Sequence, residues 1–380
     1  MSKKNKPIQL KSPSSNSAII SPSIDFLCCG GLSIVVVISI FGYAFFSPQS
    51  QLFATGVPIL GGLILGTLVN APHFMASYFL LYRNRTQVIE HKWASVYVPL
   101  ILLGIILYAF LTPTLTGSNP RINATVVEML TVVSSVLLAW HYTGQAWGMT
   151  GSFAYIGGIR MDKQERMLVR SGYYVLLVWH ILWACLFILR KMESTLANNI
   201  SDQIPHLVTL YNVWSVLVLL TIPLGIAGFL RIRRRTGIMP PLRCYAPWIA
   251  IYLWYTLIWA HPSLFALLQI FHALQYLVFP LRVEINQYAA KQERSETRRI
   301  LHGIGYYVLL VIVGLIVFEL PTLPLMWGDG KMNFLITTCL NISAVTASFV
   351  NIHHYFIDGA IWKIRNPEVR RTLFAHLKMA

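Results

Sequence analysis

The histidines are the residues of this sequence that most clearly indicate a functional site, because five of the eleven lie inside long apolar stretches. The five are His73, His141, His272, His353 and His354. Neutral imidazole is the commonest metal ligand in proteins, and it suits iron, copper, zinc and nickel better than magnesium or calcium. These residues therefore predict a transition-metal site, with iron, as one or two ions, as the favoured metal.

The helical faces that carry these histidines also carry polar residues three or four positions away. They are Asn70, Gln145, Gln275, Tyr276, Asn351 and Asp358. Amide and carboxylate groups of this kind commonly orient metal-bound imidazoles. Asp358 leaves two interpretations open: it pairs with Lys363 or Arg282, or it orients or binds the metal.

The elements that must position these side chains are transmembrane helices. The chain is 56% hydrophobic and only 12% charged, against roughly 25% charged residues in soluble domains. Apolar runs long enough to cross a bilayer predict an all-α, polytopic transmembrane bundle of about ten spans. The spans are 26–46, 53–82, 93–112, 123–149, 169–189, 206–230, 244–260, 263–281, 303–322 and 333–362. Whether spans seven and eight form a hairpin or one broken helix stays open.

The five histidines lie at similar positions within four of these spans. Each is about eight or nine residues from the predicted inner end of its span, which corresponds to roughly 12–14 Å below the cytoplasmic surface. Polar side chains inside a membrane face the bundle interior and mark a functional site by default. Four helices are thus expected to deliver imidazoles to one layer of the bundle.

Basic residues define the orientation of the chain. With ten spans, 26 Lys and Arg residues fall on one face and 4 on the other, so both termini are predicted to be cytoplasmic. The predicted organisation is a disordered cytoplasmic tail at 1–25, a transmembrane domain at 26–362 and a cytoplasmic tail at 363–380. We expect a multi-pass protein of the inner (cytoplasmic) membrane or of an organelle membrane. The net charge of +16 follows from this orientation, so no nucleic-acid partner is predicted.

Two short segments, Asn70–Phe74 and Asn351–Tyr355, carry a resemblance to a known family. One histidine per helix around a cytoplasm-facing pocket is similar to the bacterial Brp/Blh membrane proteins, which cleave β-carotene to retinal with histidine-bound iron. In that family a Pro-His pair is followed by Gly and Asp. Here the corresponding pair, Pro72-His73, is followed by Phe74 and Met75. The resemblance implies an integral-membrane iron oxygenase.

Three functional classes remain open at this point. The favoured one is a membrane-embedded, non-haem iron oxidoreductase or oxygenase that acts on a lipophilic substrate and takes electrons from a donor. The second is an electron carrier in which two histidines bind haem b. The third is a metal-free transporter or structural protein whose histidines bond neighbouring helices. Lipophilic small molecules and membrane lipids are the expected partners, and the sequence leaves open whether the protein is an enzyme.

Overall fold

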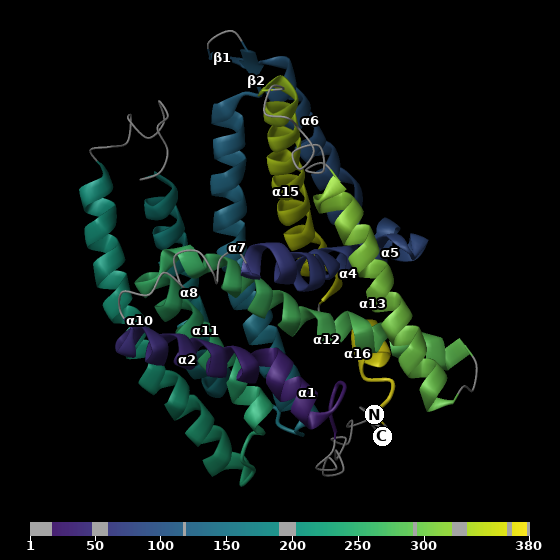
Figure 1. Ribbon diagram of the computed structural model, residues 1–380. Coiled ribbons are helices and arrows are strands. Elements are labelled where there is room, and N and C mark those ends of the chain that lie inside the picture. The colour runs from purple at the N-terminus through teal and green to yellow at the C-terminus, as the bar shows by residue number, and fades with distance from the viewer. Residues whose placement is uncertain are drawn as a thin grey trace, which may run out of the picture.

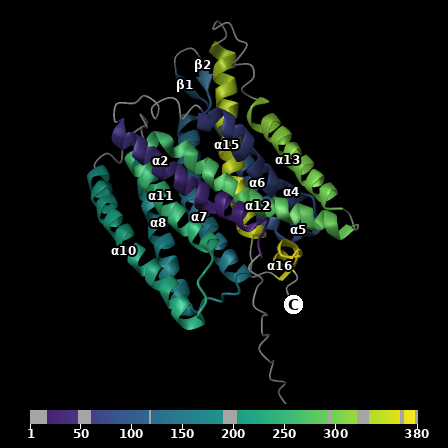
Figure 2. The same ribbon diagram turned by 60° about the horizontal axis from the view of Figure 1, so that its bottom comes forward.

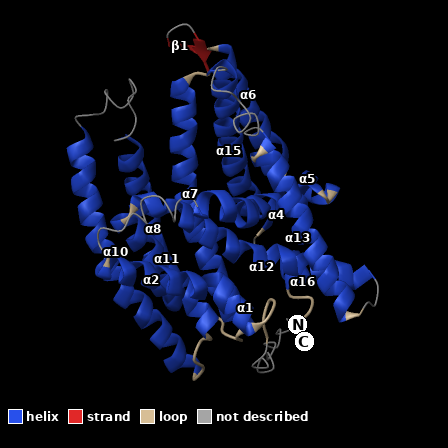
Figure 3. Cartoon of the chain, in the orientation of Figure 1, coloured by secondary structure: helices blue, strands red, loops and turns tan. Residues whose placement is uncertain are grey.

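The computed structural model describes residues 17–47, 60–116, 119–189, 203–291, 295–320, 333–362 and 367–377. Nearly all of them are helical, as Figure 3 shows. The helices in the first part of the chain are α1 (Pro22–Phe26), η1 (Leu27–Gly31), α2 (Leu32–Phe46), η3 (Leu60–Asn70), α4 (Ala71–Tyr82), α5 (Arg85–Glu90), η4 (Trp93–Tyr97), α6 (Val98–Leu111) and α7 (Ala124–Ile156). Those in the second part are α8 (Lys163–Leu189), α10 (Ile204–Thr236), α11 (Leu242–Ala260), η6 (Pro262–Leu264), α12 (Phe265–Lys291), α13 (Glu296–Phe318), α15 (Asn333–Ile361) and α16 (Pro367–Leu373).

The fold class expected from the sequence, an all-α polytopic bundle, is confirmed. In hydrocarbon a backbone must satisfy its own hydrogen bonds, and the helix does so within one segment. Within the described part of the chain, strands occur only in one short antiparallel pair. It joins β1 (Thr114–Thr116) to β2 (Asn119–Arg121) in the connection between α6 and α7, with Leu115 opposite Pro120.

Eight described helical segments are long and apolar enough to cross a membrane. They overlap eight of the ten predicted spans, and the other two predicted spans coincide with α11 and α15. In α11, most residues are buried within the protein, including Trp248 and Trp254. The count of ten crossings remains a prediction. Spans seven and eight are separate helices, because α11 ends at Ala260 and the turn through His261 and η6 precedes α12.

Helix α12 is the central element of the bundle. In its most apolar window 72% of the residues are buried inside the protein, against 22% for α7. Figures 1 and 2 show α4 and α12 running across α7 and α15. Helices that cross in this way bring residues from four distant parts of the chain to one place.

Local sequence signals explain where two important helices begin. The side chain of Asn123 accepts a hydrogen bond from the Val126 amide and so caps α7. At the start of α8, Asp162 and Glu165 each accept a hydrogen bond from the other's amide at 2.8 Å, which is a capping box. The backbone hydrogen bond from Glu165 lowers the pKa of Asp162 below its usual value.

The packed part of the protein extends beyond both predicted boundaries of the helical domain. Ile19 is fully buried, and the Asp25 carboxylate accepts hydrogen bonds from the Ile19 and Ile20 amides at 2.7 and 2.9 Å. At the other end, the Asn286 side chain donates to the carbonyls of Thr372 and α16 residue Leu373. Residues 17–25 and 367–377 therefore contain packed residues, whereas the domain boundaries at 25 and 363 remain predictions. The remainder of the predicted tails lies outside the described residues.

Both ends of the described chain meet at one end of the bundle. The His376 Nε2 atom lies 2.7 Å from the Ala18 carbonyl oxygen. A carbonyl only accepts, so His376 donates this bond. The contact agrees with an even number of crossings, whereas the side of the membrane on which it lies is still a prediction.

Reporter fusions should establish that side. We expect fusions after residue 240 and at the carboxyl terminus to report cytoplasm, because the basic residues gather on that face. Fusions near Asn119 and Asn198 should report the opposite compartment. An external carboxyl terminus would contradict the orientation predicted from charge.

Candidate metal centre

Four of the five predicted histidines meet at one point in the interior. His73 comes from α4, His141 from α7, His272 from α12 and His354 from α15. One ligand atom from each lies within 4.8 Å of those of the others, and all four residues are buried. This convergence depends on the crossing of α4 and α12 over α7 and α15 (Figure 1).

The spacing of the ring nitrogens matches that of ligands around one ion. The Nε2 atom of His354 lies 3.1 Å from that of His73 and 3.2 Å from that of His141. The Nε2 atoms of His141 and His272 are 2.9 Å apart. Nitrogen ligands about 2.0–2.1 Å from a shared metal lie about 2.9–3.4 Å from one another, depending on the coordination angle. Three neighbouring pairs therefore have the spacing of ligands that share one metal ion, and the four side chains together could hold one.

The backbone around His73 determines which of its nitrogens can bind a metal. Its Nδ1 atom lies 2.7 Å from the Asn70 carbonyl oxygen, so Nδ1 carries the proton and Nε2 of the neutral ring presents a lone pair to the centre. Pro72 stands directly before His73 and has no amide hydrogen. The carbonyl of Leu68, four residues before this proline, accepts a hydrogen bond from the Tyr307 hydroxyl instead.

The carboxylate of Asp358 faces the same centre. Its Oδ2 atom lies 3.3 Å from Nε2 of His354 and 3.8 Å from Nε2 of His141. Its Oδ1 atom accepts hydrogen bonds from Ser77 at 2.7 Å and from Tyr276 at 2.9 Å. With Oδ1 held in this way, Oδ2 is the oxygen available to bind or orient a ligand. Arg282, the alternative partner considered above, donates to backbone carbonyls of the amino-terminal segment, and Lys363 lies outside the described residues.

His353 lies outside the four-histidine cluster. Its Nε2 atom is 2.8 Å from the Ala94 carbonyl oxygen, and its Nδ1 atom is 2.9 Å from the Tyr78 hydroxyl. Both ring nitrogens are thus occupied by groups of the protein. Adjacent helical residues point about 100° apart, so His353 and His354 project to different faces of α15.

The remaining predicted neighbours differ in their relation to the cluster. Tyr276 bonds to Asp358, and its ring centre lies 5.4 Å from that of His73. The Gln145 side chain donates to the backbone carbonyl of His272 at 3.0 Å. Gln275 donates away from the cluster, to the Cys29 carbonyl. The Asn351 side chain bonds to Ala347 and Tyr355 of its own helix, and the Tyr355 ring centre lies 4.7 Å from that of His141. Asn70 acts through its carbonyl, as described above.

Sequence reasoning missed two residues that hold Asp358 in place. Ser77 donates to the carboxylate directly, and the Trp362 indole donates to the Tyr276 hydroxyl at 2.8 Å. Ser77 follows His73 by four positions, and Trp362 follows Asp358 by four. The same-face rule that selected the other neighbours would have found both.

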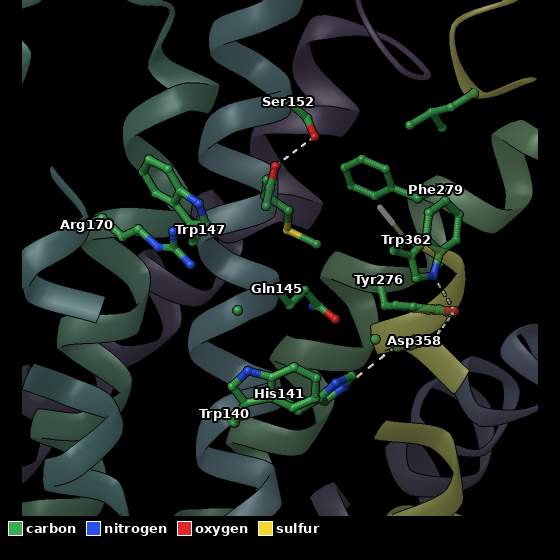
Figure 4. Close-up of a pocket in the computed structure, with 15 residues that line it drawn as sticks. Trp140, His141, Gln145, Trp147, Ser152, Arg170, Tyr276, Phe279, Asp358 and Trp362 are labelled. Carbon is green, nitrogen blue, oxygen red and sulfur yellow. Dashed lines mark hydrogen bonds and ion pairs between the residues drawn. The ribbon is translucent and has the colours of Figure 1, made fainter. Parts of the chain in front are cut away.

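A pocket of about 270 Å³ reaches one side of the centre (Figure 4). Of the residues at the centre it touches His141, Asp358 and Tyr276. The rest of its lining is Trp140, Gly144, Gln145, Trp147, Gly148, Met149, Ser152, Arg170, Phe279, Gly359, Trp362 and Leu373. Most of this lining is apolar, which suits a hydrocarbon ligand.

Comparisons with protein-family models, curated proteins and solved structures find no match to this chain. The fold and the site define a class: a membrane-type helical protein with a buried four-histidine cluster that could hold a metal ion.

Proposed function

We propose that this protein is a membrane-embedded oxidoreductase that binds one transition-metal ion, preferably iron, and acts on a lipophilic substrate. The observation that carries the proposal is the convergence of four imidazoles and one carboxylate from four helices. Imidazole with a carboxylate is a donor set suited to redox-active iron. The resemblance to the Brp/Blh proteins, which rests on the Pro72-His73 and His353-His354 segments, agrees with this choice of metal.

The donor geometry favours a bare ion over haem b. In a bis-histidine haem the two axial nitrogens lie on opposite faces of the macrocycle, about 4 Å apart, and the porphyrin fills the positions between them. Here four Nε2 atoms crowd together, with contacts of 2.9–3.2 Å. A macrocycle would have to occupy the space that the other imidazoles already fill.

Each part of the site has a distinct role in this proposal. His73, His141, His272 and His354 hold the ion, while Ser77 and Tyr276 keep Asp358 turned toward it. When bound, iron supplies one-electron redox chemistry and the capacity to activate dioxygen. The pocket brings the substrate to the side of the centre formed by His141 and Asp358, and its mostly apolar walls contact the hydrocarbon.

The lipophilic substrate follows from the location and lining of this pocket. A hydrocarbon already dissolved in the membrane can enter it without crossing water, and membrane lipids surround the protein. Insertion of a single oxygen atom, or desaturation, consumes two electrons from an external donor, so we propose such a donor as a partner. The proposed location is the inner membrane or an organelle membrane.

Metal analysis of the purified protein, together with its absorption spectrum, tests this function. We expect about one iron per chain and no intense Soret band, because the four imidazoles leave no room for a porphyrin. Stoichiometric haem with a strong Soret band would instead favour the electron carrier. Protein without any transition metal would favour a metal-free transporter or structural role.

A further inference from the structure

One positive charge lies in the wall of the apolar pocket. Arg170 of α8 lines it opposite His141 and Asp358, as Figure 4 shows. The carbon at the centre of its guanidinium lies 5.4 Å from the Trp147 ring centre and 4.8 Å from that of Tyr174. The two aromatic rings hold the cation at the pocket wall by packing and cation–π attraction.

Three other arginines at this end of the bundle have acidic partners, whereas Arg170 has none within the described part of the chain. Arg235 binds Glu165 through two hydrogen bonds, Arg231 lies 3.6 Å from Asp162, and Arg243 lies 3.8 Å from Asp25. Within the part of the chain that the structure describes, Arg170 forms no ion pair, although it is half-buried. A half-buried cation beside an apolar cavity is therefore available to an anionic ligand.

We propose that the pocket binds an amphiphile with a carboxylate at one end of a hydrocarbon chain, such as a long-chain fatty acid. The carboxylate pairs with Arg170, whose planar guanidinium matches two carboxylate oxygens. The hydrocarbon runs along α7 toward His141 and Asp358. The identity of this ligand as the substrate rests on the proposed function, but its binding does not.

Two glycines of α7 make room for the chain. Gly144 and Gly148 line the pocket, and a side-chain carbon added at either would meet no atom within 4 Å. From His141 to Trp147, the residue beneath Arg170, the helix rises about 9 Å. An extended chain held at Arg170 would thus present to the centre a carbon that lies roughly seven bonds from its carboxylate.

The test compares a fluorescent polyene fatty acid with its methyl ester. Binding to the metal-loaded, full-length protein in lipid nanodiscs is measured by energy transfer from tryptophan. We expect the acid to bind about tenfold more tightly than the ester, because a hydrogen bond to a charged group is lost with the ester. Arg170→Gln should remove this preference and leave the metal content unchanged.

Two matched variants control for charge and shape. Arg166→Gln removes an exposed positive charge one turn away on the same helix and should keep the preference. Gly148→Leu should block both probes, whereas Gly151→Leu should not, because Gly151 has equal open space but does not line the pocket.

Several outcomes would overturn the proposal. One is equal binding of acid and ester by the wild type. Another is a loss of the preference for the acid in Arg166→Gln as large as that in Arg170→Gln. A phospholipid that copurifies with the wild type but not with Arg170→Gln would also do so, by assigning Arg170 to a lipid phosphate. Tight, Arg170-dependent binding by a protein that holds no metal would support the ligand assignment while contradicting the proposed oxidoreductase.

Discussion

Replacing His354 with alanine is expected to lower the metal affinity of the purified protein by about 100-fold or more, whereas His353→Ala should leave it nearly unchanged. The Nε2 atom of His354 contacts those of two other cluster histidines at 3.1 and 3.2 Å. Loss of a residue that only orients a metal ligand lowers metal affinity by about 10–100-fold. Loss of His354, a ligand itself, should lower it further. His353 has both nitrogens occupied elsewhere. Metal content after dialysis against a graded chelator measures the difference.

This pair of variants is closely matched, because the residues are adjacent, buried and of the same type. Loss of the His353 bonds to Tyr78 and Ala94 should instead lower thermal stability. If the two variants lost metal equally, the four-histidine centre would be the wrong ligand set, and the five-histidine set predicted from sequence would be favoured.

Replacing Asp358 with asparagine should lower metal affinity by about 10–100-fold, the range found for groups that orient or support metal ligands. Asparagine keeps the size of the side chain, and its oxygen can still accept the hydrogen bonds from Ser77 and Tyr276. Its amide nitrogen would then point toward the cluster and present hydrogens where Oδ2 of Asp358 now lies, 3.3 Å from Nε2 of His354. Those hydrogens compete for the nitrogen lone pair and oppose a cation. Metal titration by calorimetry measures the loss.

Glu284→Gln serves as the control for removing a buried negative charge. Glu284 is 7% exposed and pairs with Arg83 and His302, whereas the cluster contains neither of these residues. We expect it to reduce stability without changing the metal affinity of the folded protein. Unchanged metal affinity in Asp358→Asn would show that the carboxylate serves the packing of α15 alone.

The sequence was sufficient for the class of fold because composition acts over the whole chain. Few charges and long apolar runs leave helices in a membrane as the stable arrangement. The sequence also identified all four histidines of the cluster. Imidazoles and an acidic residue within apolar helices are costly unless they have partners, so their presence there indicates a site.

The equal-depth argument, however, does not describe how the histidines meet. Helix α7 continues to Ile156 and α12 to Lys291, beyond the predicted span ends at 149 and 281. His141 and His272 therefore lie many more residues from the carboxyl-terminal ends of α7 and α12 than His73 lies from that of α4. They converge because α4 and α12 cross the other two helices (Figure 2), an arrangement that positions along each helix do not reveal.

Only the tertiary structure decided which neighbouring polar groups serve the site. Spacing identifies residues that share a helix face, but rotation of the helix decides what that face meets. Gln275 and His353 therefore bond elsewhere, whereas Ser77 reaches Asp358 from another helix. Arg170 lies in the pocket wall because α8 packs beside α7. Sequence determined the types of groups and the helices that carry them, and the crossing of those helices determined which groups meet.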